Sequence, residues 1–259
     1  QDPLGQTWAA YKADPRSVAP GALTYNTRKS IDHQQLGTNY ERYFGDATLQ
    51  VNAYTGRRSV IQYLSIPDKF DKGFTNPANT RGGVVAFDRK FYGGSVHWLQ
   101  PVTSAPGDLT FIAGLDYDRS EDDRQGYSNT VNGVHGVKGA LGRDEIDTAI
   151  SLDPFVQANW LLGDWTLQAG LRHSAMKMDV DDRFLSGGDD SGSKTYQKNT
   201  PSVSVMYAFT PDLHGYFSAG KGFETPTQAE SAYSNSSNGF NFALKPSLST
   251  QYEVGLKAR

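Results

Sequence analysis

Two groups of arginines with polar neighbours are the residues of this chain best suited to bind an anion. Each group lies where a stretch of alternating apolar and polar residues gives way to a long polar segment. The candidate ligand-binding residues are Arg57, Arg58, Gln62, Tyr63, Arg119, Arg124 and Tyr127. A guanidinium presents a rigid fork of donors that matches the two oxygens of a carboxylate. These residues therefore suit a small, carboxylate-bearing molecule.

The same arginines could instead be neutralised by acids of the chain itself. Asp116, Asp118 and Glu121 lie close to the second group in the sequence. Charges that line a polar interior are usually paired, so an ion pair is the better interpretation for any single arginine. Both interpretations stay open for the two groups as a whole.

The acids and histidines do not predict a metal site. The aspartates around a Gly- and Ser-rich segment fail the spacing of the twelve-residue calcium loop, so solvated loop acids are the better interpretation. The histidines form no pair at metal-ligand spacing, and Met176 and Met178 near His173 are better explained by contact with lipid or a neighbouring side chain than by copper. The residues considered are Asp179, Asp181, Asp182, Asp189, Asp190, His33, His97, His135, His173 and His214. No cofactor is expected.

Catalysis is not predicted either. His173 stands beside Ser174 without a recognisable nucleophile turn, and the Gly-Gly pairs of the chain do not match a phosphate loop. His97 and His214 fall on the polar faces of their stretches, where hydrogen bonding is the expected role. We therefore expect a protein that is not an enzyme.

The elements that position these residues are β-strands, because alternation with a period of two dominates the chain. The clearest stretch runs from Trp165 to Arg172, with Trp165, Leu167, Ala169 and Leu171 on one face. Similar alternation predicts strands at 49–53, 109–117, 152–162, 203–209, 213–219 and 252–256, with weaker candidates at 28–44 and 91–100. About nine antiparallel strands are expected.

Short and long connectors alternate between these strands. The short ones are 45–46, 103–108, 163–164 and 210–212, and the long ones are 67–88, 122–147, 186–196 and 228–248. Aromatic residues such as Trp160 and Trp165 flank short turns, which predicts an interfacial girdle. The predicted fold class is therefore all-β, an antiparallel transmembrane β-barrel portion with short periplasmic turns and long external loops.

Composition agrees with a barrel. The 259 residues carry a formal net charge of -3 without a basic stripe, so nucleic acid is not an expected partner. The sequence contains no run of about eighteen apolar residues for a spanning helix. Barrel strands need only about ten alternating residues, which is compatible with a mean hydropathy of -0.56. The chain has no cysteine and hence no disulfide framework.

Several motifs resemble the barrel of TonB-dependent outer-membrane receptors, the transporters that take up iron-siderophore complexes, cobalamin and related scarce ligands. Residues 220–227 (GKGFETPT), 244–247 (LKPS) and 252–256 (YEVGL) carry this resemblance. Residues 27–31 (TRKSI), 63–67 (YLSIP), 114–117 (GLDY), 188–192 (GDDSG) and 222–226 (GFETP) look like the enterobacterial subgroup associated with pyrroloquinoline quinone uptake. The resemblance runs over residues 1–259.

The resemblance implies a transporter in the outer membrane of a Gram-negative bacterium. Its implied partners are outer-membrane lipid, the TonB complex and a small ligand, either a ferric siderophore or a redox cofactor such as pyrroloquinoline quinone. Ligand capture would fall to the external loops and the upper lumen. The family plan has a TonB box, a plug and roughly twenty-two strands. Residues 1–259 are therefore interpreted as part of the barrel domain, with the TonB box and the plug domain absent.

A soluble β-rich carbohydrate-binding or adhesion domain is the alternative. A sandwich of this kind would bury Leu167, Ala169 and Leu171 against a second sheet, whereas a barrel would expose them to lipid. The direction in which the apolar face points therefore discriminates between the two.

Overall fold

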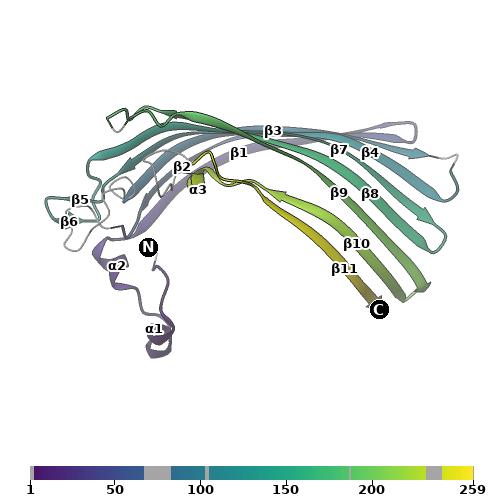
Figure 1. Cartoon of the computed structure of the whole chain (residues 1–259), viewed down its shortest axis with the longest axis horizontal. Coiled ribbons are helices and arrows are strands. Elements are labelled where there is room, and N and C mark those ends of the chain that lie inside the picture. Colours follow the sequence, from purple (N-terminus) through teal and green to yellow (C-terminus); the bar gives the residue numbers. More distant parts are fainter. Residues whose placement is uncertain (1–2, 67–82, 103–104, 187, 232–240, 259) are drawn as a thin grey trace.

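A single arched sheet of antiparallel strands makes up most of the protein (Figure 1). The computed structural model describes residues 3–66, 83–102, 105–186, 188–231 and 241–258. Within these ranges each strand of the nine-stranded sheet pairs with the next one along the chain, apart from a small separate hairpin. The strands are β1 (Arg28–Phe44), β2 (Ala47–Tyr63), β3 (Val84–Val102), β4 (Asp108–Tyr127), β7 (Leu141–Leu162), β8 (Trp165–Asp182), β9 (Gly192–Thr210), β10 (Leu213–Glu224) and β11 (Ser247–Ala258). The predicted fold class and strand number are confirmed.

One face of the sheet is apolar and exposed. Register places Val96 opposite Leu115 and Val156 opposite Leu171, and these four side chains are 43–56% exposed. A contiguous exposed apolar surface of this kind marks contact with a non-aqueous environment. The residues between them form a polar face, on which Ser95 is buried. Side chains crowd on the inside of an arch, so the more buried polar face is the concave one.

Tight turns join the strands at one end of the sheet. Gly45 and Gly163 begin two-residue turns and adopt left-handed φ angles of 60° and 58°, which glycine reaches without a steric penalty. Aromatic rings gather beside these turns, as where the ring centroids of Trp165 and Tyr207 lie 4.6 Å apart. The predicted short-turn end, with its aromatic side chains, is confirmed.

At the other end the strands run further than alternation predicted. The connector predicted at 122–147 is wrong in its bounds, because Asp122 of β4 and Asp147 of β7 are partners within the ladder. β3 and β9 likewise begin inside the connectors predicted at 67–88 and 186–196; residues 67–82 and 187 lie outside the described part. In β4 the residues of both faces are polar from Asp118 to Gln125, yet the hydrogen-bonded ladder with β7 continues through them.

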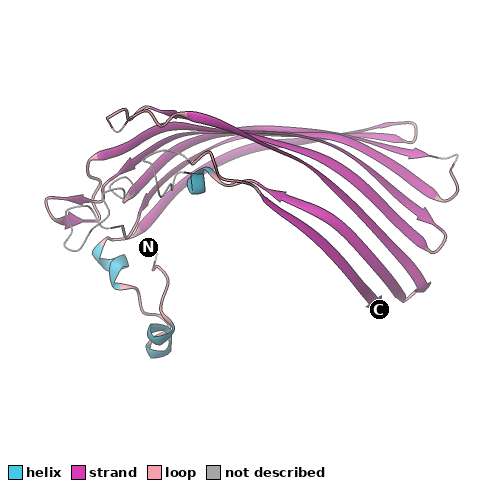
Figure 2. Ribbon diagram, viewed as in Figure 1, coloured by secondary structure: helices cyan, strands magenta, loops and turns pink. Residues whose placement is uncertain are grey.

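In the described ranges three short helices and a small hairpin accompany the sheet, and none of them was predicted (Figure 2). They are α1 (Trp8–Ala13), α2 (Pro20–Thr24), α3 (Gln228–Ser231) and the hairpin of β5 (Thr130–Val131) and β6 (Val134–His135). The segment after α2 packs on the hairpin, where Arg28 Nη1 donates to the Gly136 carbonyl oxygen at 3.2 Å. None of the described helices has the length and apolar character needed to cross a membrane.

Candidate functional site

The strand register divides the candidate ligand-binding residues between the two faces. Alternate residues of a strand share a face, and Arg58 lies opposite Arg89, which in turn lies opposite Asp122. Arg58, Gln62 and Arg124 are on the concave face, and Arg57, Tyr63, Arg119 and Tyr127 are on the convex face. Each of the two sequence groups is therefore divided between the faces, and ligand binding by these residues stays a prediction.

Most described arginines on the concave face near the long loops form ion pairs. Arg89 binds both carboxylate oxygens of Asp122 at 2.6 Å. Arg124 Nη1 lies 3.5 Å from Asp147 Oδ2, too poorly aligned for a hydrogen bond. Asp122 and Asp147 are 6% and 1% exposed, and a buried charge requires a partner. The pairing interpretation therefore holds for Arg124, although its partner is Asp147 and not an acid predicted from the sequence.

The second group shows pairing on the convex face as well. Arg119 Nη2 lies 3.1 Å from Glu121 Oε2, as the sequence predicted for one of the nearby acids. Asp118 lies on the concave face instead, where it accepts a hydrogen bond from the Tyr54 hydroxyl. Of the acids near this group, Glu121 therefore neutralises Arg119, whereas Asp118 contacts a tyrosine.

Arg58 differs from the other arginines of the concave face. It faces Arg89 across the β2–β3 ladder, but the fork of Arg89 is already used by Asp122. Within the described part of the chain Arg58 has no ion pair, and its Nε is buried without a hydrogen-bond partner. Gln62 shares the face four residues further along β2. Among the described residues, Arg58 is therefore a concave-face cation that lacks a carboxylate partner.

Asp147 is an unusual acid at the upper end of the concave face. The apolar band of the convex face ends at Ile150, whose cross-strand neighbours Arg119 and Lys177 are charged. Asp147 lies three residues further along β7 toward the long loops and hence outside the band. Burial raises the pKa of Asp147 to about 7, and the neighbouring Glu145 carboxylate acts in the same direction against the opposing charge of Arg124. The Asp147 carboxyl group therefore changes between its protonated and ionised forms near neutral pH.

We expect the stability of this end of the sheet to fall as the pH rises from about 4 to about 7. The pKa of Asp147 in the folded state exceeds its ordinary value of 3.8, so the folded state holds the proton more tightly than the unfolded state across that interval. Asp147→Asn should flatten this dependence by on the order of 2 kcal/mol. Thermal unfolding of the complete receptor at pH 5 and pH 8 measures the effect.

Asp181→Asn is the matched control for that prediction, because Asp181 is an exposed acid of the convex face. It should leave the pH dependence of unfolding unchanged. An equal flattening by both substitutions would contradict the assignment to Asp147.

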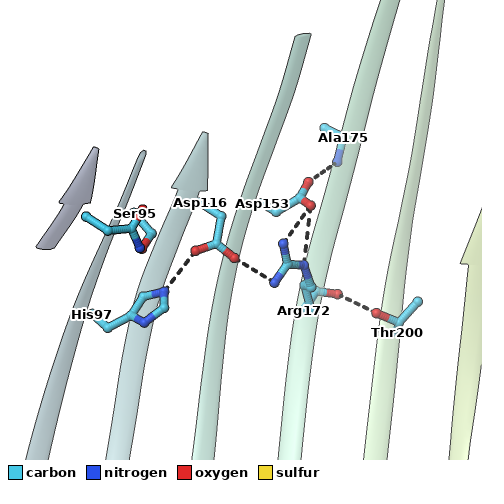
Figure 3. A network of polar contacts seen from close by, with 8 residues as sticks. Ser95, His97, Asp116, Asp153, Arg172, Ala175 and Thr200 are labelled. Atoms are coloured by element: carbon cyan, nitrogen blue, oxygen red, sulfur yellow. Dashed lines mark hydrogen bonds and ion pairs between the residues drawn. The ribbon is translucent and has the colours of Figure 1, made fainter. Parts of the chain in front are cut away.

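A polar network spans four strands at the centre of the concave face (Figure 3). His97 Nε2 and Asp116 Oδ1 are 2.8 Å apart, and Arg172 Nη1 is 2.8 Å from Asp116 Oδ2. Arg172 Nη2 is also 2.8 Å from Asp153 Oδ2. One guanidinium thus joins two carboxylates that lie directly opposite each other on β4 and β7. The predicted hydrogen-bonding role of His97 agrees with this contact.

A proline helps to explain why Asp153 takes part in the network. The β7–β8 ladder is interrupted between the pairs Leu152–Ala175 and Phe155–Arg172, and Pro154 within this gap has no N–H to donate. Asp153 Oδ1 accepts the Ala175 N–H at 3.1 Å instead. The carboxylate therefore satisfies the backbone and binds Arg172 at the same time. Only the polar alternation of Arg172 was visible in the sequence, because the register that joins it to Asp153 was unknown.

The histidine and methionine positions offer no shared metal site. His173 Nδ1 lies 2.7 Å from Asn199 Oδ1 on the convex face, whereas Met176 and Met178 point to the concave face. Met178 is 7% exposed, which fits contact with neighbouring side chains. Among the described residues no group of three or more acids and histidines is arranged to hold a metal ion.

The fold and this site together define a class of protein. A curved antiparallel sheet with an apolar convex face, a charged concave face and tight turns at one end is a wall of an outer-membrane β-barrel. The chain belongs to the TonB dependent receptor-like β-barrel family, whose model matches residues 1–259. Members of this family are outer-membrane transporters and receptors of Gram-negative bacteria and not enzymes.

Solved structures agree with this fold at low sequence identity. The unliganded ferric citrate transporter FecA is 16% identical, with a TM-score of 0.73 over 99% of this chain and 36% of its own. The copper transporter OprC is 15% identical, with a TM-score of 0.69 over 91% of this chain and 38% of its own. The siderophore receptor PiuA from Acinetobacter baumannii is 15% identical, with a TM-score of 0.68 over 90% and 38%. The chain thus spans 36–38% of the length of these three proteins.

Proposed function

We propose that this chain forms a ligand-facing wall of a TonB-dependent transporter that imports a scarce, negatively charged ligand. The ligand is a ferric siderophore or a quinone cofactor such as pyrroloquinoline quinone. The observation that carries the charge preference is Arg58, a half-buried cation of the concave face without an ion pair among the described residues. Its donor fork suits a carboxylate of the ligand.

Neighbouring charges support a role for Arg58 in binding. Asp122 holds the Arg89 guanidinium by two hydrogen bonds of 2.6 Å, so Arg89 contributes a fixed and largely neutralised group. Arg58 lies opposite it and has no ion pair in the described part of the chain. Neighbours that are already fixed reduce the conformational entropy lost when an anion binds.

Residues 1–259 match the barrel model of the family. We therefore assign these residues to the barrel domain of the receptor. A single curved sheet with its apolar side exposed argues against the soluble carbohydrate-binding or adhesion domain, which would stack two sheets.

Binding of chemically distinct ligands to the complete, detergent-solubilised receptor tests the charge preference. The probes are pyrroloquinoline quinone, a ferric carboxylate siderophore and a neutral ferric hydroxamate, compared by isothermal titration calorimetry. We expect at least one carboxylate-bearing probe to bind about tenfold or more tightly than the neutral chelate, because a charge-assisted hydrogen bond contributes about 1.5–3 kcal/mol. Preferential binding of the neutral chelate would contradict the proposal.

A further inference from the structure

A cationic groove lies on the convex face, away from the ligand path. Its volume is about 610 Å³, and its lining includes Thr55, Arg57, Lys90, Tyr92 and Arg119. We call these residues the convex groove. Because the convex face carries the exposed apolar band, the groove opens toward the surroundings of the barrel and not toward its lumen.

Like charges are held side by side in the convex groove. Arg57 on β2 is directly opposite Lys90 on β3, and both side chains are exposed. Cross-strand neighbours of like charge destabilise a sheet unless a counter-charge is present. Neither residue has an ion pair within the described ranges, and Glu121 opposite Lys90 is engaged by Arg119 at 3.1 Å. Three cations thus share one carboxylate, which leaves the groove electropositive.

The position of the groove relative to the apolar band indicates which kind of anion it contacts. Tyr92 lies two residues from Lys90 on the same face, and its ring centroid is 6.1 Å from that of Tyr117. Val96 continues this face as an exposed apolar residue. Exposed tyrosines at the edge of an apolar band mark the headgroup layer of a membrane. The groove therefore lies at headgroup level on the side of the long loops.

Acidic residues limit the cationic zone to that level. The next convex row away from the apolar band carries Asp88 and Asp123, and Asp123 accepts a hydrogen bond from Arg183 at 3.2 Å. Anions further from the membrane would meet these carboxylates. A ligand that places its negative charge beside Tyr92 avoids them.

We propose that the convex groove binds the phosphate-bearing headgroup of a lipid in the outer leaflet, with the acyl chains against the apolar band below Tyr92. The guanidinium of Arg57 suits the phosphate oxygens by its fork, and Lys90 adds a point charge. A cation near a membrane surface attracts anionic lipid. The inference rests on the membrane location shared by the family and is independent of the imported ligand proposed above.

Native mass spectrometry of the complete receptor in detergent tests this assignment. The probes are lipid A with two phosphates, its dephosphorylated form and inorganic phosphate. Arg57→Gln combined with Lys90→Gln should weaken binding of phosphorylated lipid A by about tenfold or more, since two cations are lost. Dephosphorylated lipid A should bind the unaltered receptor weakly, and inorganic phosphate at equal concentration should not displace the lipid.

Lys221→Gln is the matched control, because Lys221 is an exposed lysine of β10 that is remote from the groove. It should change lipid A binding less than twofold. Heat-modifiable gel mobility verifies that each barrel is folded. If the double variant does not fold, Lys90→Gln alone is measured in its place. Unchanged lipid binding in the groove variants would overturn the proposal, as would equal displacement by inorganic phosphate.

Discussion

Replacement of Arg172 by leucine should destabilise the barrel by about 2–4 kcal/mol, because it leaves two facing carboxylates without their shared cation. Arg172 lies 2.8 Å from both Asp116 and Asp153, which are opposite each other in the register. Removal of the guanidinium turns this arrangement into a like-charge pair on the concave face. The side chains keep 17–38% exposure, so solvent screening places the effect near the lower value. Urea unfolding of the complete receptor, followed by tryptophan fluorescence, measures the loss.

Three variants separate this electrostatic effect from a general cost of substitution. Arg172→Lys keeps the charge but not the fork and should lose less stability. Asp153→Asn added to Arg172→Leu should recover part of the loss, because it removes one of the facing charges. Lys198→Leu, an exposed concave position without an ion pair among the described residues, should cost less than about 0.5 kcal/mol. Equal losses for Arg172→Leu and Lys198→Leu would contradict the role of the network.

Replacement of Arg58 by glutamine should weaken binding of the anionic ligand by about tenfold to a hundredfold. Glutamine keeps a donor at this position but loses the charge and the fork, and a hydrogen bond to a charged group contributes about 1.5–3 kcal/mol. Because Arg58 has no carboxylate partner among the described residues, its removal leaves no buried acid behind. The fold should therefore persist while affinity falls, which calorimetry and thermal unfolding of the same sample can separate.

The adjacent arginine provides the control for Arg58. Arg57→Gln makes the same chemical change one residue away, but Arg57 lies on the convex face. Ligand affinity in detergent should then be retained. A similar loss of affinity in both variants would show that the two faces are wrongly assigned or that the effect is indirect.

The arrangement of the strands was predictable from sequence because lipid and lumen impose a period of two on each strand. The same period also separates Arg57 from Arg58, although both belong to one group of candidate residues in the sequence. Cross-strand register decides which polar residues meet, and a single sequence does not provide it. The contact of Arg172 with Asp116 and Asp153 therefore became apparent only from the structure.

The predicted loop bounds failed for a different physical reason. Apolar alternation ends where the apolar band ends, but the backbone ladder continues through Asp122 and Asp147. Polar residues on both faces there look like loop residues in a sequence. The helix α2 was missed as well, because it has only five residues and provides little periodic signal beyond Pro20 in its first turn.

Energised uptake is the most direct test of a transporter wall built from this sheet. Cells that carry the complete receptor as their sole route for the labelled ligand are compared with and without a functional TonB complex. We predict that the ligand accumulates only when TonB is functional, and that Arg58→Gln lowers the accumulation at limiting ligand concentration. Equal accumulation without TonB, by a receptor shown to be folded in the outer membrane, would contradict the proposed function.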